Sequence, residues 1–322
     1  MILLFQQWSR SARLTAGVLL LVAVLGGCAS MAPQAAVLRD AWPAGLPERV
    51  ELTDVPFFPQ EDYQCGPAAL ATSLAHFKVK VTPDDLAAQV YLPARQGSLQ
   101  VEMLATPRRY GMVAYQLAPR LEDLLREIAA GTPVIVLQNF GNAWHYAVVV
   151  GYDYPKGELI VRSGQKQRLL MPFFVLEYTW KKSGYWAMVT LPPARIAVTA
   201  TESSWLAAVV AMARVADAPA VQTAYETLLA RWPDDVTASV GLANRFYANG
   251  ALAAAEAVLR LAADHHPDSV AVLNNLAQTL SDEGRNDEAL LLIERAAAID
   301  GPYAGATRET RDLILQRQGG AR

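Results

Sequence analysis

The C-terminal part of the chain repeats itself with a period of 34 residues. From about Thr201 the composition becomes rich in alanine, and similar residues return at equivalent places in each period. These places are occupied by Trp205, Ala208, Tyr225 and Pro233, then by Ser239, Leu242, Leu259 and Pro267, then by Leu273, Leu276, Ile293 and Gly301. A repeated helix pair buries its apolar face only by stacking on its neighbours. Residues 200–322 are therefore predicted to form an all-α array of stacked helix pairs.

The details of the period resemble one repeat family. Gly250 and Gly284 stand where the two helices of a pair would be joined, and Ala255 and Ala289 stand where they would cross closely. This pattern resembles the tetratricopeptide repeat. The resemblance implies about three repeats, of which the first is degenerate, a capping helix over residues 307–318, and a concave groove that binds a protein partner or substrate. The alternative is an ordinary alanine-rich helical bundle.

The beginning of the chain has the pattern of an export signal. Arg10 and Arg13 precede an apolar stretch of 12 residues, which is short for a membrane-spanning helix of roughly 20 residues. The stretch ends in Leu25-Gly26-Gly27-Cys28, which resembles a bacterial lipobox. We therefore expect residues 1–27 to be a lipoprotein signal peptide and Cys28 to become the acylated N-terminus. An uncleaved anchor or a plain secretory signal is the alternative.

This expectation determines the location of the protein and the state of its thiols. Ser30, which stands where some lipoproteins have an acidic residue, implies an outer-membrane lipoprotein that faces the periplasm. Residues 28–50 contain several prolines and a glycine and are expected to form a lipidated tether. The chain has two cysteines, so acylation of Cys28 leaves Cys65 without a disulfide partner. A single thiol in an exported protein is a candidate reactive group.

The surroundings of Cys65 predict that it begins a helix. Pro67 suits the first turn of a helix, and Leu70, Leu74 and Phe77 form an apolar stripe at i, i+4 and i+7. The N-terminus of a helix favours an anion, so Cys65 is expected to have a lowered pKa and to be largely thiolate at neutral pH. A buried structural cysteine is the alternative.

A reactive thiol needs a base, and the mature chain offers four histidines. His76 lies on the same helix as Cys65, about three turns away. His265 and His266 precede Pro267 at the end of a repeat helix, where histidines complement the helix dipole. His145 is left, at the head of an apolar strand, and is the candidate base.

The region that holds this pair is predicted to be an α+β domain over residues 51–195. Helical patterns occupy its first part and antiparallel strands follow. The strand signals lie at residues 113–117, 133–137, 146–152, 159–162 and 186–191. The order of a cysteine on a helix and then a histidine on a strand is that of papain-like enzymes.

Two motifs carry a closer resemblance. Gln60 with Cys65-Gly66-Pro67-Ala68-Ala69-Leu70, followed by His145-Tyr146-Ala147-Val148-Val149-Val150-Gly151-Tyr152, resembles the double-glycine leader peptidases that process bacteriocins. The resemblance implies that Cys65 is the nucleophile, that His145 is the general base, and that Gln60 donates a hydrogen bond to the oxyanion; Gln64 is the alternative donor. It also implies an aspartate after the histidine strand, where this chain has Ser163. Either Ser163 or Asn139 could orient the imidazole instead, whereas Asp153 belongs to a hairpin turn.

The sequence therefore predicts an envelope-anchored cysteine peptidase whose repeats recruit a protein partner or substrate. A catalytically weak scaffold on the same fold, or a transferase, is the alternative. The net charge of −3 and the absence of a long basic run give no sign of a nucleic-acid partner. No metal or organic cofactor is implied.

Overall fold

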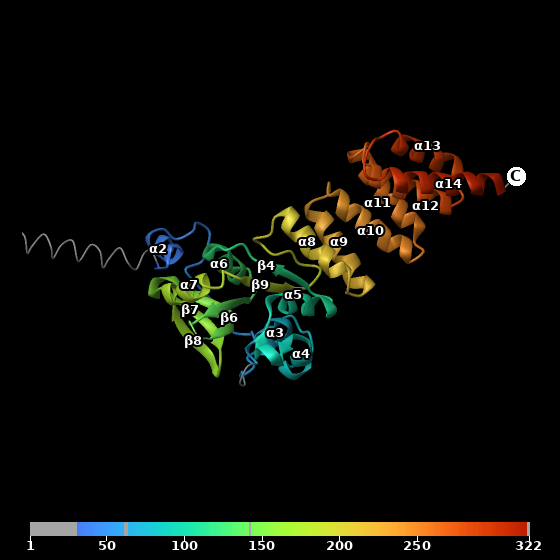
Figure 1. Cartoon of the computed structure of the whole chain (residues 1–322). Coiled ribbons are helices and arrows are strands. Elements are labelled where there is room, and N and C mark those ends of the chain that lie inside the picture. Colours follow the sequence, from blue (N-terminus) through green and yellow to red (C-terminus); the bar gives the residue numbers. More distant parts are fainter. Residues whose placement is uncertain (1–30, 61–63, 142, 321–322) are drawn as a thin grey trace, which may run out of the picture. The chain divides into compact units, whose positions relative to one another are not determined.

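The structure, a computed structural model, describes residues 31–60, 64–141 and 143–320 (Figure 1). The predicted signal peptide, the acylation site Cys28 and the start of the tether lie outside the described residues. The chain forms two compact units, one up to Thr106 together with Tyr115–Thr190, and one of Pro107–Ala114 together with Leu191–Arg322. Within the described ranges, no helix is both long and apolar enough to cross a bilayer.

The first unit is built on an antiparallel sheet, of which Val113, Ala114 and Leu191 fall in segments assigned to the second unit. In the part of the chain that the structure describes, the sheet has seven strands in the order β4-β9-β5-β6-β7-β8, with β1 paired to β6. Their bounds are β1 (Arg49–Glu51), β4 (Val113–Gln116), β5 (Val134–Asn139), β6 (Trp144–Asp153), β7 (Glu158–Ser163), β8 (Lys166–Pro172) and β9 (Ala187–Leu191). Continuous apolar, largely β-branched runs make β5 and β6 the buried centre of this sheet.

Helices and a small hairpin complete the first unit. The helices are α2 (Pro33–Asp40), α3 (Cys65–His76), α4 (Pro83–Val90), α5 (Gln100–Arg109), α6 (Leu121–Ala129) and α7 (Phe173–Lys181), and β2 (Tyr91–Leu92) pairs with β3 (Gly97–Ser98). Helix α3 packs on β6, and its Leu70 and Leu74 are fully buried, as the predicted stripe requires. The cysteine that begins α3 is thereby held against the central strand.

Residues 33–50 differ from the lipidated tether that the sequence predicts over residues 28–50. They form α2 and β1, and β1 pairs with β6 through Val50 and Tyr152. Trp42, which follows α2, stacks on Tyr154 with ring centroids 4.2 Å apart. The short helix buries few residues of its own, and its tertiary hydrogen bonds join it to residues 85 or more positions away. No local periodicity could reveal such a helix.

Strand β8 and helix α7 were not predicted either. Three of the seven residues of β8 are exposed in succession, so the strand lacks the alternation of apolar and polar residues that marks a half-buried strand. Helix α7 begins directly after Pro172 without a side-chain cap. Both elements depend on pairing with β7 and on packing against β5.

The second unit, apart from Pro107–Ala114, is all-helical and keeps the predicted period. Its helices are α8 (Glu202–Ala213), α9 (Ala218–Arg231), α10 (Val236–Ala248), α11 (Leu252–His265), α12 (Val270–Asp282), α13 (Asn286–Ala297) and α14 (Ala304–Gly320). The first helices of successive pairs begin at residues 202, 236, 270 and 304, in step with the sequence repeat. Gly250 and Gly284 have φ of 75° and 82° at the turns, a conformation that favours glycine. The degenerate first copy still forms a helix pair, with Trp205 fully buried.

Candidate active site

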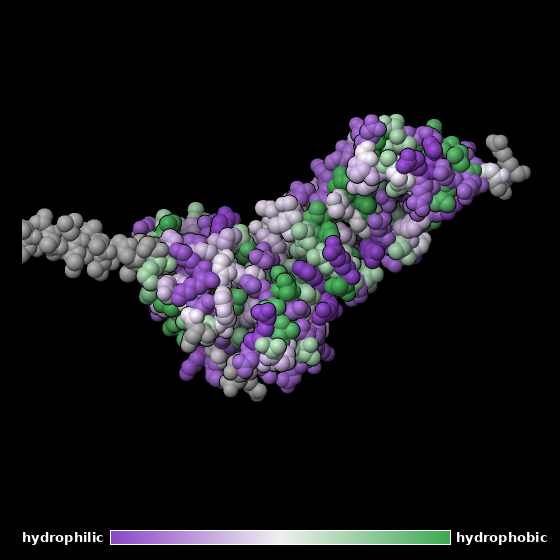
Figure 2. All heavy atoms as spheres, viewed as in Figure 1, coloured by the Kyte–Doolittle hydropathy of each residue, from purple (hydrophilic) through white to green (hydrophobic). Residues whose placement is uncertain are grey.

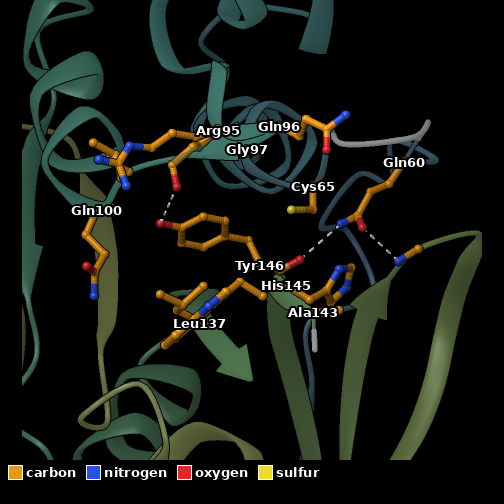
Figure 3. Close-up of a pocket in the computed structure, with 14 residues that line it drawn as sticks. Gln60, Cys65, Arg95, Gln96, Gly97, Gln100, Leu137, Ala143, His145 and Tyr146 are labelled. Carbon is orange, nitrogen blue, oxygen red and sulfur yellow. Dashed lines mark hydrogen bonds between the residues drawn. The ribbon is translucent and has the colours of Figure 1, made fainter. Parts of the chain in front are cut away.

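Cys65 begins α3 and faces a cleft of about 780 Å³ between α3, the β2–β3 hairpin and β6 (Figure 3). The thiol is half-buried, and backbone hydrogen bonds to Tyr146 and Gly66 hold it. Pro67 lies in the first turn of the helix, where its missing N–H removes no helical bond. The predicted helix start is confirmed, and it places the thiol at the base of a surface cleft.

His145 enters the same cleft from the start of β6. The register of the sheet pairs it with Gln138 on β5, and it lies next to the half-exposed Trp144. Its Nε2 lies 2.8 Å from Ser163 Oγ at the end of β7. That contact occupies one ring nitrogen and leaves Nδ1 for another partner.

The structure separates the candidates for the group that orients His145. Ser163 contacts the ring, whereas Asn139 Oδ1 accepts a hydrogen bond of 2.7 Å from the Gly141 N–H of its own turn. Asp153 lies at the far end of β6, paired with Arg49. Among the described residues, Ser163 rather than Asn139 is therefore the one of the two predicted candidates that contacts the His145 ring.

Gln60 lies beside Cys65 and is held from two sides (Figure 3). Its Oε1 accepts a hydrogen bond of 3.0 Å from the Gly164 N–H, and its Nε2 donates to the Tyr146 carbonyl oxygen at 3.3 Å. These bonds assign the orientation of the amide and leave the second Nε2 proton for a group in the cleft. Gln64, the alternative donor, is the N-cap residue of α3.

The electrostatics of the site differ from the expectation of a preformed thiolate. Burial raises the pKa of the Cys65 thiol, and the backbone hydrogen bonds that favour its anion offset this only in part. Burial lowers the pKa of His145. The expected depressed pKa of Cys65 is wrong for the resting site, because desolvation outweighs the helix terminus. Both shifts favour the neutral forms of the two side chains.

The other histidines lie elsewhere. His76 Nε2 bonds to the Gly131 carbonyl oxygen at 3.1 Å, and its Nδ1 lies 3.7 Å from Asp54 Oδ2. His265 and His266 both contact Asp234 in the repeats. Across the described ranges, no group of three or more histidine, cysteine or acidic side chains is arranged to hold a metal ion.

The β2–β3 hairpin is a wall of the site that sequence reasoning missed. A Cβ added to Gly66 would lie 2.2 Å from Ser98 Oγ, so β3 approaches the start of α3 in a way that only glycine permits. The Tyr146 hydroxyl donates to the Ser98 carbonyl oxygen at 3.2 Å and ties the hairpin to β6. The glycine directly after Cys65 was the signal that could have revealed this contact.

Comparisons with known proteins agree with this geometry. Residues 52–184 match the model of the Peptidase_C39 like family. A search of curated proteins finds no match. The first unit thus has the papain-like α+β fold of C39-type peptidases, and an all-helical region follows it.

Solved structures give weaker likenesses. A double glycine motif protease from an AMS/PCAT transporter, in complex with its leader peptide, is 22% identical, with coverage of 43% of this chain and 91% of that chain and a TM-score of 0.34. The peptidase domain of Streptococcus ComA is 18% identical, with coverage of 43% and 98% and a TM-score of 0.37. The TPR2B domain of yeast Sti1 in its pHsp70 complex is 20% identical, with coverage of 31% and 85% and a TM-score of 0.30.

Proposed function

We propose that the chain is a cysteine peptidase that cleaves peptide bonds of a peptide or protein substrate. The observation that carries this proposal is the convergence of three groups on one cleft. They are the thiol at the start of α3, the imidazole bonded to Ser163, and the Gln60 amide with a free proton. Acyl transfer needs a nucleophile, a base and an oxyanion donor, and each group supplies one of these.

Because burial raises the pKa of the Cys65 thiol, the proposed proton transfer to His145 accompanies the attack on the substrate. Cys65 Sγ attacks the substrate carbonyl carbon while its proton passes to Nδ1 of His145. In the neutral ring Nε2–H already donates to Ser163 Oγ, which leaves Nδ1 unprotonated and able to accept that proton. The carbonyl oxygen becomes an oxyanion that accepts hydrogen bonds from Gln60 Nε2 and the Cys65 N–H. His145 next protonates the leaving amine, and water hydrolyses the thioester with His145 again as base.

Two alternatives use the same geometry. A transferase would pass the acyl group of the Cys65 thioester to an amine rather than to water. A scaffold with little turnover is favoured by the raised pKa of Cys65 and by a serine in place of a carboxylate at position 163. The position of Gln60 argues against a scaffold function, because two hydrogen bonds hold its amide beside the thiol.

The proposal includes an envelope location. The export pattern and the lipobox-like Leu25-Gly26-Gly27-Cys28 support acylation of Cys28 and an outer-membrane anchor that faces the periplasm. The 34-residue helix pairs support a tetratricopeptide-type array that binds a protein partner or substrate. Mass spectrometry of the N-terminal peptide, with and without globomycin, tests the anchor. A mature chain that begins elsewhere and carries no lipid would contradict it.

The enzyme itself is tested with a peptidyl epoxide, which alkylates a cysteine that is activated in a substrate cleft. Mass spectrometry should locate the adduct on Cys65 in the folded chain. The rate should fall in His145→Ala and should stay unchanged in His76→Ala, the matched control outside the cleft. Labelling of the folded chain no faster than labelling of the urea-unfolded chain would favour the scaffold.

A further inference from the structure

Helix α2 is fixed to the first unit at its N-terminus. The N–H groups of Gln34 and Ala35 donate to the carboxylate of Glu177 on α7 at 3.0 and 2.6 Å. Gln34 Oε1 also accepts from the Leu121 N–H at 2.6 Å, at the start of α6. Glu177 is fully buried, and a buried carboxylate at a helix N-terminus is a favourable arrangement. The chain therefore becomes part of the folded unit at Pro33.

This attachment leaves little length for a tether. Pro33 lies five positions after Cys28, and five steps of a fully extended chain span at most about 18 Å. A flexible tether as far as residue 50 would span up to roughly 75 Å. If Cys28 carries the acyl chains, the face that holds the start of α2 must therefore lie close to the bilayer surface.

The two elements joined by this attachment, α2 and α7, expose apolar and basic side chains. On α7, Phe174 and Tyr178 are 60% and 39% exposed, one helical turn apart, and Lys182 lies on the same side. Lys182 Nζ lies 4.1 Å from the centre of the Tyr178 ring. Met31, next to α2, is 48% exposed. Figure 2 shows hydrophobic residues interspersed with hydrophilic ones at the surface over α2 and α7.

We propose that this surface, defined by Met31, Phe174, Tyr178 and Lys182 and called the α2–α7 face, lies on the anionic headgroups of the membrane that holds the anchor. The inference rests on the proposed acylation of Cys28. Aromatic side chains suit the boundary between headgroups and acyl chains, and a lysine with an apolar stem attracts anionic lipid. The acyl chains and the α2–α7 face together provide two attachments, which hold the peptidase unit in one orientation.

The test compares the acylated full chain in vesicles of phosphatidylethanolamine and phosphatidylglycerol with the Cys28→Ser full-length mature chain in buffer. Hydroxyl-radical footprinting should show severalfold lower oxidation of Met31, Phe174 and Tyr178 in the vesicles. Tyr303, which is 51% exposed in the repeats, should be oxidised equally in both samples. Phe174→Asp combined with Lys182→Glu should restore oxidation of Tyr178, whereas Leu291→Asp, at an exposed repeat position, should not.

Different results would refute the proposed anchor and the proposed α2–α7 face. An N-terminal peptide without lipid would refute the anchor and the orientation together. An acylated Cys28 with full oxidation of Phe174 and Tyr178 in vesicles would refute the α2–α7 face alone and would leave the anchor standing. Protection that also includes Tyr303 would point to general shielding by the vesicle and would overturn the assignment of this face.

Discussion

The hydrogen bond between Ser163 and His145 offers the sharpest test of the proposed site. Ser163→Ala removes the partner that lies 2.8 Å from Nε2 and releases the tautomer and orientation of the ring. A hydrogen bond of this kind contributes about 0.5–1.5 kcal/mol. At about 1.4 kcal/mol for each tenfold change in rate, kcat/KM should fall by about 2-fold to about 13-fold.

Ser163→Asp should act in the opposite direction. A carboxylate bonds to imidazolium more strongly than a hydroxyl does, by roughly a factor of two. It should leave kcat/KM at its plateau unchanged or higher, and it should raise the pKa of His145. Burial lowers that pKa in the native site, so the acid limb of the profile should lie below the ordinary histidine value of about 6.5. Since His145 must be neutral to accept a proton, Ser163→Asp should move this limb to higher pH.

The assay is kcat/KM against pH on a fluorogenic peptide that the native chain cleaves. Ser73→Ala is the matched control, because its hydroxyl makes a 2.7 Å hydrogen bond to Thr190 Oγ1 away from the cleft. The control should lower thermal stability without moving the acid limb. If Ser163→Ala and Ser163→Asp both keep the native rate and the native limb, Ser163 merely packs beside the ring and the reasoning fails.

Three further outcomes follow from the geometry. Gln60→Ala should lower kcat by roughly 100-fold or more but leave the alkylation rate of Cys65 nearly unchanged, because the oxyanion forms only after attack. Equal losses of turnover and of alkylation rate would point to a structural role for Gln60. Because burial raises the pKa of Cys65, the rate of its alkylation by iodoacetamide should still increase with pH above about 8.5. A rate that is already constant near neutral pH would refute a neutral resting thiol. Gly66→Ala should lower the melting temperature and the turnover together, since the added Cβ would lie 2.2 Å from Ser98 Oγ. A Gly301→Ala control, in which the added Cβ meets nothing within 4 Å, should leave both unchanged. An unchanged Gly66→Ala variant would show that β3 moves away at little cost.

Local sequence determined much of the architecture. The positions of the repeat helices follow from a 34-residue pattern of small and apolar residues, which acts within one helix pair and its neighbours. The helix that begins at Cys65 follows from Pro67 and an apolar stripe, both within a few turns of the thiol. His145, at the start of a continuous apolar strand, was identified in the same way. The rest of that strand is buried, so only a side chain at its end can face a cleft.

Tertiary structure decided the questions that depend on distant residues. Ser163 rather than Asn139 contacts His145, because the Asn139 side chain accepts a hydrogen bond within the turn after β5. Strand β7, by contrast, ends beside β6 and places Ser163 next to the ring. Helix α2 was invisible to pattern reasoning because its N-terminal N–H groups find their acceptor in Glu177, 143 residues along the chain from Gln34. The pKa of Cys65 was misjudged for the same reason. A helix N-terminus can be read from neighbouring residues, but the desolvation that outweighs it arises only when the sheet and the hairpin close around the thiol.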